Sequence, residues 1–310
     1  MKGLLLSITL FNVLAVTTAA KRFAFRQDGF QDWYQSYWQV HLLNFFMDRG
    51  IPVTASVFGG KVTGADKTLL SALKRCVSLG ADKCGLSNYG VDASYTYDQA
   101  NSSTVAYNHM KVADDKIHTL FPGYTIETFV PYQNAWNEYT LEAAKLLGYS
   151  AVSASVQNYS MLAYNTSSDP LQLSQHTQTG DYISTGAWIA HPIEKSVAEC
   201  EKASAKGDVC VILTQPYEFS TGAYTWTMLQ YLVNNLTALG YKGVNFHTII
   251  QEVKELPIPS AAPTHMPSGK HFAFRQDGVE DWYNSKQQIE LLSFFMDRGI
   301  PVSAGITGNF

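Results

Sequence analysis

Several patterns that would assign a chain to a familiar functional class are missing from this sequence. Basic residues are scattered and the formal net charge is −4, which argues against nucleic-acid binding and against a basic membrane-binding patch. No apolar run is long enough to span a bilayer comfortably. The cysteines form no C-x2-C pair and the histidines show no metal-ligand spacing, so neither indicates a zinc site. The G-x-S-x-G motif of serine hydrolases is also missing.

An internal repeat is the most informative feature that is present. Phe23–Gly60 reappears without gaps at Phe272–Asn309, at a constant offset of 249 residues and with about two thirds of the positions identical. We therefore expect one complete domain of about 240 residues, followed by the first βαβ unit of an incomplete second copy. Two explanations of that second copy stay open. It is either the remnant of a truncated tandem array or incomplete gene model, or a segment that docks on another chain.

The N-terminal residues have the pattern of a secretory signal peptide. Lys2 supplies the positive charge, Leu4–Val16 the apolar stretch and Thr18–Ala20 the small residues of a cleavage site. We expect a secreted, extracellular protein whose mature chain starts at Lys21. The expected organisation is a signal peptide at 1–20, a barrel at 21–256, a linker rich in Pro, Ser and Ala at 257–269, and the partial repeat at 270–310.

Glycosylation motifs and paired cysteines fit that compartment. Four N-x-[ST] sequons predict N-glycosylation at Asn101, Asn158, Asn165 and Asn235. The four cysteines allow three disulfide connectivities. We favour the two local pairs, Cys76–Cys84 and Cys200–Cys210, because each would join the end of a helix to the start of the following strand.

A recurring pattern of amphipathic helix, glycine and short β-branched run organises the domain. It occurs at Leu42–Val57, at Leu69–Gly80, at Leu141–Val156 and at Met228–His247. Strands that alternate with helices predict a parallel sheet covered on both faces. At this length a closed or partly closed (β/α) barrel is favoured over an open sheet, with functional groups at the C-terminal ends of the strands. The polar stretch Gln157–Trp188 interrupts the pattern, and we expect it to lie on the surface over one end of the barrel.

Motifs at the predicted strand ends resemble those of the NodB-type polysaccharide deacetylases, and of their secreted branch in particular. They are FAFRQDGFQDWY, Cys-Gly-Leu-Ser-Asn, FVPYQNAWN and VILTQPYEF, in the order in which that family carries its motifs. The resemblance covers nearly all of Phe23–Val253. It implies a (β/α) barrel that uses a divalent metal ion to hydrolyse acetyl groups from polysaccharides.

The same resemblance implies that the metal site is degraded. Aligned through Phe25 and Arg26, Asp28 takes the place of the catalytic base, and Gly29 takes the place of a carboxylate metal ligand. Anchored instead on Asp28–Gly29, Asp28 would be the ligand and Gln27 the lost base. The second copy repeats these residues as Arg275–Gly278, so the altered motif occurs twice in one chain.

Three further positions depart from the family pattern. Cys84 and Asn88 fall where the resemblance implies the two histidines of an H-x-x-x-H metal motif. Gln215 falls where a histidine would protonate the leaving group, and an amide cannot transfer a proton. We expect no metal cofactor and no family chemistry, with Asp28 and Gln215 as remnants of the site. The alternative is one divalent metal, such as zinc, held by ligands that these alignments miss.

Aromatic residues near the strand ends are candidate sugar-binding residues. Five are proposed for stacking on a glycan, although packing under loops would also explain each of them: Trp33, Tyr34, Tyr132, Trp136 and Tyr217. For three acidic residues a structural role is favoured over a catalytic one. Asp28 and Asp32 are expected as solvated loop carboxylates or helix caps, with Asp32 suited to cap a helix over Trp33–Arg49, and Glu218 as a solvated charge.

The sequence leaves more than one function open. Our leading hypothesis is a secreted, glycosylated, deacetylase-like barrel without catalytic activity, which binds a polysaccharide or serves as an extracellular matrix component. The alternative is an active metal-dependent polysaccharide deacetylase. An unrelated α/β hydrolase is a third possibility. The expected partners are glycans and, through the C-terminal partial repeat, other copies of the same chain.

Overall fold

Seven parallel strands close into a ring in the computed structural model of the protein, which describes residues 20–155, 170–183, 187–255, 274–279 and 302–306. The strands are β1 (Arg22–Phe30), β2 (Val53–Val57), β3 (Cys84–Asn88), β4 (Thr128–Phe129), β5 (Ala151–Ser155), β6 (Leu171–Gln178) and β9 (Cys210–Thr214). Each pairs with the next in this order, and β9 pairs back onto β1. The predicted (β/α) barrel is confirmed, and its ring is closed rather than partly closed.

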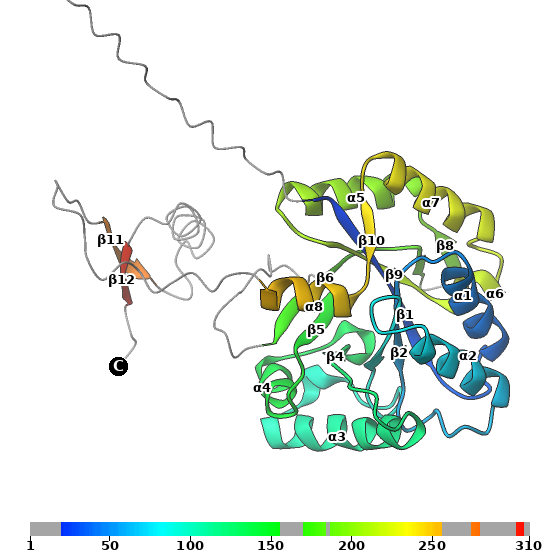
Figure 1. Ribbon diagram of the computed structural model, residues 1–310. Coiled ribbons are helices and arrows are strands. Elements are labelled where there is room, and N and C mark those ends of the chain that lie inside the picture. The colour runs from blue at the N-terminus through cyan, green and yellow to red at the C-terminus, as the bar shows by residue number, and fades with distance from the viewer. Residues whose placement is uncertain (1–19, 156–169, 184–186, 256–273, 280–301, 307–310) are drawn as a thin grey trace, which may run out of the picture. The chain divides into compact units, whose positions relative to one another are not determined.

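Helices surround the ring (Figure 1). They are α1 (Ser36–Asp48), α2 (Lys67–Ser78), α3 (Ser103–Leu120), α4 (Glu138–Leu146), α5 (Ile193–Ala205), α6 (Pro216–Ser220), α7 (Trp226–Ala238) and α8 (Phe246–Glu255), with short 3-10 turns η1 (Tyr97–Gln99) and η2 (Tyr132–Asn134). Their apolar faces pack on the outward side chains of the strands, as where the rings of Phe25 in β1 and Phe46 in α1 lie 4.8 Å apart. None of the helices in the described part of the chain is long and apolar enough to cross a membrane.

Glycines end the helices as the sequence pattern predicts. Gly50 follows α1 with a φ of 63°, and Gly148 follows α4 with a φ of 77°. Both angles lie in the left-handed region, which residues with a Cβ atom avoid. The chain therefore leaves each helix at a fixed point and enters the next strand after a few residues.

The N-terminal end of the barrel is closed by α8. Asn245, just before this helix, donates to the carbonyl oxygen of Ala81 at 2.6 Å, and His247 is hydrogen bonded to Glu127 at 2.5 Å. Ala81 and Glu127 precede β3 and β4, so these contacts fix α8 at the strand starts. The prediction of a strand that reaches His247 was wrong, because β10 (Lys242–Val244) ends earlier. Among the described residues, β10 pairs with the start of β1. The opposite, C-terminal end of the barrel is left for a functional site.

The polar stretch predicted as a surface excursion contains part of the barrel. It supplies β6, which pairs with β5 and β9, and it ends in an antiparallel strand pair, β7 (Gly180–Tyr182) with β8 (Trp188–Ala190). Most side chains of β6 are only half-buried, so its sequence lacks the continuous apolar run of a strand that is buried on both faces.

Asp32 does not cap α1, in contrast to the sequence prediction. The helix begins at Ser36, and the residue at its N-cap is Gln35, which has a left-handed conformation. The Asp32 carboxylate instead accepts hydrogen bonds from the backbone and hydroxyl groups of Thr63, at 2.9 and 2.6 Å, and from the backbone of Ala65. It joins the loop after β1 to the loop after β2.

Both predicted disulfides are confirmed. Cys76 of α2 is bonded to Cys84 of β3, and Cys200 of α5 to Cys210 of β9. Each therefore ties a helix to the strand that follows it. Of the four sequons, those at Asn101 and Asn235 lie on exposed side chains, whereas Asn158 and Asn165 lie outside the described residues.

The chain divides into two units, residues 1–256 and residues 257–310. In the second unit β11 (Phe274–Val279) pairs in parallel with β12 (Val302–Ile306), and Phe274 lies opposite Val302. In the first unit Phe25 of β1 lies opposite Val53 of β2, and each of these positions is 249 residues earlier. The register is therefore the same in both copies, and in each a register shift precedes the last pair, Phe30 with Val57 in the first copy and Val279 with Ile306 in the second.

Candidate functional site

A buried ion pair occupies the interior of the barrel toward its C-terminal end. Arg26 and Asp28 lie two residues apart on β1, so both side chains point to the inner face. Arg26 Nη2 lies 2.8 Å from Asp28 Oδ2, with side-chain exposures of 0% and 3%. The expectation that Asp28 is a solvated loop carboxylate was therefore wrong. Burial raises the pKa of Asp28, and this outweighs the lowering by Arg26 and by the hydroxyl of Ser56.

The guanidinium of Arg26 is surrounded by oxygen atoms from three other segments. Nη1 donates to the carbonyl oxygen and hydroxyl of Ser153, at 3.2 and 3.0 Å. Nη2 donates to Asn134 Oδ1 at 2.7 Å and to Gln175 Oε1 at 3.0 Å. On the other side, Ser56 donates to Asp28 Oδ1 at 2.8 Å. The centre of this end of the barrel thus already holds a fixed positive charge, and the polar atoms around it are directed toward that charge.

The positions matched to the histidines of the metal motif do not form a ligand pair. Cys84 starts β3 and Asn88 ends it, so they are about 13 Å apart at the usual rise of a strand. Cys84 is in a disulfide, and Asn88 donates to Met110 O and Tyr149 Oη while accepting from the backbone of Gly90. The structure therefore does not support matching these two residues with the two histidines.

The remaining motif positions do not complete a metal centre. Gly29 has a φ of 88° at the register shift of β1, and it has no side chain to bind an ion. Gln27 points away from the barrel interior and donates to the backbone of Gln39 in α1. Gln215 precedes α6 at the end of β9 and does not cap that helix with its side chain. In the described part of the chain no three His, Cys, Asp or Glu side chains are grouped as metal ligands, so this donor set does not fit a divalent metal ion.

Four aromatic side chains form a row of neighbouring rings at the C-terminal end of the barrel. Tyr34 stacks near Tyr217 with ring centroids 6.3 Å apart, Tyr217 lies 6.2 Å from Trp188, and Trp188 lies 5.6 Å from Tyr182. We call these four residues the aromatic rim. Tyr34 and Tyr182 are 49% and 62% exposed, so the rim offers ring faces to solvent.

Strained backbone occurs in the loop that carries Tyr34 of the rim and in η2. Trp33 and Gln35 flank Tyr34 and have φ angles of 63° and 51°, and in η2 Gln133 and Asn134 have φ angles of 56° and 58°. Left-handed conformations of such residues are costly, and they tend to gather at functional sites. The side chain of Trp33 is also 71% exposed, so its strained backbone is not offset by burial of the indole ring.

The candidate sugar-binding residues are only partly brought together. Tyr34 and Tyr217 belong to the rim. Tyr132 packs on Phe58 and Tyr89, with ring centroids 5.5 and 5.8 Å apart. The pKa of Tyr34 is raised by burial and by Tyr217, Tyr132 and Tyr182. Trp33 lies beside Tyr34 in sequence.

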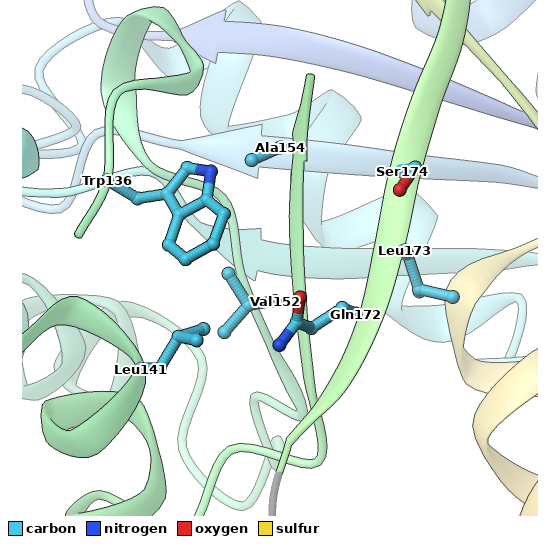
Figure 2. Close-up of a pocket in the computed structure, with 7 residues that line it drawn as sticks. All are labelled: Trp136, Leu141, Val152, Ala154, Gln172, Leu173 and Ser174. Carbon is cyan, nitrogen blue, oxygen red and sulfur yellow. The ribbon is translucent and has the colours of Figure 1, made fainter. Parts of the chain in front are cut away.

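Trp136 is separate from the rim. It lines a small pocket between α4 and the outer side of β5 and β6, where it faces Leu141, Val152 and Ala154 (Figure 2).

Two residues of the rim, Tyr182 and Trp188, were not predicted from the sequence. Both lie in the polar stretch 157–188, where two aromatic residues near its end were the signal that could have indicated them.

Glu218 is buried rather than solvated, in contrast to the sequence prediction. It is 1% exposed in α6, directly after Tyr217, and it accepts a hydrogen bond from the hydroxyl of Thr179. Its pKa is raised to about 8, chiefly by burial and to a smaller extent by the carboxylate of Asp181, while the hydrogen bond from Thr179 lowers it. The buried environment of Glu218, next to Tyr217 of the rim, therefore favours the protonated, neutral form of its carboxyl group.

Comparisons with known proteins identify the fold and leave the family unassigned by sequence. No protein-family model matches the chain, and no match was found among curated proteins. A protein from Mycobacterium smegmatis described as a polysaccharide deacetylase has a similar structure, with a TM-score of 0.55 and 15% sequence identity over 71% of this chain and 78% of its own. The 4-alpha-glucanotransferase from Thermococcus litoralis has a TM-score of 0.51 and 12% identity over 74% of this chain and 40% of its own. The fold is a (β/α) barrel like those of these two proteins.

Proposed function

We propose that this protein is a secreted, glycosylated, deacetylase-like barrel that binds an uncharged polysaccharide and does not hydrolyse it. The aromatic rim is the observation that carries the proposal, because exposed ring faces at the C-terminal end of such a barrel suit stacking on sugar rings. The carboxylates beside the rim are engaged by the protein itself: Asp32 by Thr63, and Asp181 by His191. A ligand without charge therefore fits this surface best.

The proposed lack of hydrolysis follows from the groups inside the barrel. Asp28 is the carboxylate that the resemblance assigns to catalysis, yet it is paired with Arg26 and shielded from solvent. A base must reach the water or hydroxyl from which it takes a proton. Gln215 offers no titratable proton for a leaving group. We infer that Arg26 supplies the positive charge that stabilises this end of the barrel, in the region where the family uses a metal ion.

Secretion and glycosylation are supported by independent features. The two disulfides suit an oxidising compartment. The sequons at Asn101 and Asn235 present exposed asparagines. Peptide mapping of protein from a eukaryotic expression host would test both sites, and glycan-free peptides at Asn101 and Asn235 would contradict this part of the proposal.

Titration with neutral oligosaccharides tests the binding function. We would measure binding of chitohexaose, cellohexaose and xylohexaose by calorimetry to the protein and to two variants. Tyr34→Ala with Tyr217→Ala removes two adjacent rings of the rim, and we expect at least a tenfold loss of affinity, since each buried aromatic contact is worth about 1–2 kcal/mol. Tyr231→Ala removes a tyrosine of α7 that is 57% exposed, and it should bind as the unmodified protein does. Equal affinity of all three proteins, or no binding to any sugar, would reject the proposal.

An active deacetylase is the second candidate, and the likeness to the Mycobacterium smegmatis structure favours it. Elemental analysis of the purified protein and acetate release from acetylated chitooligosaccharides and acetylxylan separate the two. We expect no stoichiometric Zn²⁺, Co²⁺ or Mn²⁺ and no acetate. One metal ion per barrel, lost on chelation together with acetate release, would establish the enzyme and reject a non-catalytic role.

Self-association through the partial repeat is a further part of the proposal, and the pairing of β11 with β12 supports it. In the barrel the equivalent strands β1 and β2 have further neighbours, β9 and β3, whereas each of β11 and β12 is paired only with the other among the described residues. Unpaired strand edges readily accept another strand. We expect full-length protein to form oligomers in light scattering and a variant ending at Leu256 to be monomeric. Identical masses would reject this.

A further inference from the structure

A buried carboxyl group lies directly under the β7–β8 strand pair. The carboxyl carbon of Glu218 approaches Gly180 so closely that a Cβ atom there would lie 3.4 Å away from it. Oε2 accepts from the hydroxyl of Thr179, which immediately precedes β7, while the buried Oε1 has no hydrogen-bond partner. Glu218 is therefore a point of attachment between α6 and the start of the strand pair.

The charged groups around Glu218 disfavour its ionised form. Asp181, on β7, raises its pKa, and Tyr224 lies near enough for Glu218 to raise the pKa of that phenol in turn. The bases of this region face Asp181: His191 Nε2 is 2.5 Å and Lys195 Nζ is 3.8 Å from Asp181 Oδ2. Among the described residues, no cationic group forms an ion pair with Glu218. Loss of its proton would thus leave a buried carboxylate with one donor and a neighbouring negative charge.

Three of the four rings of the aromatic rim belong to the β7–β8 strand pair and to α6, the elements that Glu218 connects. Tyr182 follows Asp181 on β7, Trp188 begins β8, and Tyr217 immediately precedes Glu218. The contacts of Trp188 with Tyr182 and with Tyr217, at 5.6 and 6.2 Å, bridge the strand pair and α6. A displacement of the strand pair relative to α6 would therefore break the rim between Trp188 and Tyr217.

We propose that Glu218 is a proton-controlled switch of the aromatic rim, neutral and closed when protonated, and opened by the loss of its proton to water. When Glu218 ionises, the strand pair moves away from α6 so that water can solvate the carboxylate, and the continuous row of rings is lost. Polysaccharide affinity then falls in alkaline solution. This step rests on the proposed binding function, but the motion of the strand pair does not depend on any ligand.

Hydrogen exchange tests the motion without a ligand. Amide exchange of Gly180–Tyr182 and Trp188–Ala190 would be followed at pH 6.5 and pH 9, corrected for intrinsic exchange rates, in the unmodified protein, in Glu218→Gln and in Glu142→Gln. Glu142 is an exposed carboxylate of α4 and serves as the matched control. We expect the protection of these amides to fall about tenfold at pH 9 in the unmodified protein and in Glu142→Gln, and to stay constant in Glu218→Gln. Equal protection at both pH values in the unmodified protein, or the same loss in Glu218→Gln, overturns the switch.

Binding of the tightest sugar from the neutral panel provides the second measurement. For a single proton with a pKa of about 8, the apparent Kd should rise about tenfold from pH 6.5 to pH 9. In Glu218→Gln it should stay at the pH 6.5 value. Loosening of the strand pair without binding of any sugar at either pH would reject the proposed function and retain the switch. If the strand pair loosens while sugar binding stays independent of pH, the rim does not depend on the position of the strand pair. That result would overturn the proposed link between the switch and sugar affinity.

Discussion

Replacement of Arg26 by methionine tests the inference that a guanidinium holds the C-terminal end of the barrel together. The side chain is fully buried, and Asp28, Ser153, Asn134 and Gln175 all direct oxygen atoms toward it. Methionine fills much of the volume but leaves the carboxylate without a cation and the other acceptors without a donor. Removing one partner of a buried ion pair costs about 3–5 kcal/mol. Because a domain is stabilised by about 5–15 kcal/mol in total, Arg26→Met should lie near the limit of stable folding.

A second substitution separates the effect of charge from the effect of shape. Asp28→Asn in the Arg26→Met background removes the uncompensated charge and keeps an oxygen to accept from Ser56, so we expect it to recover about 1–3 kcal/mol. Urea unfolding at pH 7, followed by tryptophan fluorescence with the disulfides intact, would give the four free energies of the cycle. Arg75→Met is the matched control, because its pair with Asp48 is exposed at 44% and 55%, and it should cost less than about 1 kcal/mol.

Two outcomes would refute this reasoning. If Arg26→Met lost no more stability than Arg75→Met, the buried pair would not stabilise the barrel end. If the double variant lost the full sum of its two single variants, the two charges would act independently, in spite of the 2.8 Å that separates them.

Three further predictions concern other parts of the barrel. The pKa of Glu218 rises from 4.5 to about 8 on folding. The contribution of protonated Glu218 to the free energy of unfolding is therefore fully present below about pH 4.5 and is lost as the pH rises to about 8. Relative to Glu218→Gln, the free energy of unfolding should fall by up to about 5 kcal/mol over that interval, and parallel pH curves would contradict the burial. Replacing Cys76 and Cys84 together by alanine should cost about 2 kcal/mol in urea unfolding, because a short loop constrains the unfolded chain modestly, and an unchanged midpoint would contradict this. Trp33→Gly should increase the free energy of unfolding by about 1 kcal/mol, and so raise the thermal midpoint, because glycine relieves the left-handed conformation of an exposed residue. The same variant should bind sugar more weakly, because it loses the indole ring. A lower midpoint would show that Trp33 stabilises the loop.

Features that depend on neighbours along the chain could be predicted from the amino-acid sequence alone. The alternation of helix and strand, the glycines that end helices and the two disulfides were all predicted from local patterns. The disulfides span only 8 and 10 residues, so adjacent elements alone bring the cysteines together. The repeat likewise predicted β11 and β12, because the same residues form the same strand pair in both copies.

Which polar groups are buried, and what they contact, depends on the folded arrangement of the whole barrel. Arg26 meets Ser153, Asn134 and Gln175 across 127, 108 and 149 residues, and no local pattern encodes those contacts. Whether a carboxylate such as Glu218 is solvated or neutral depends on how much water the surrounding elements exclude. That exclusion arises when the barrel closes and β7 and β8 pack over α6, so it is a property of the assembled fold rather than of the residues near Glu218 in sequence.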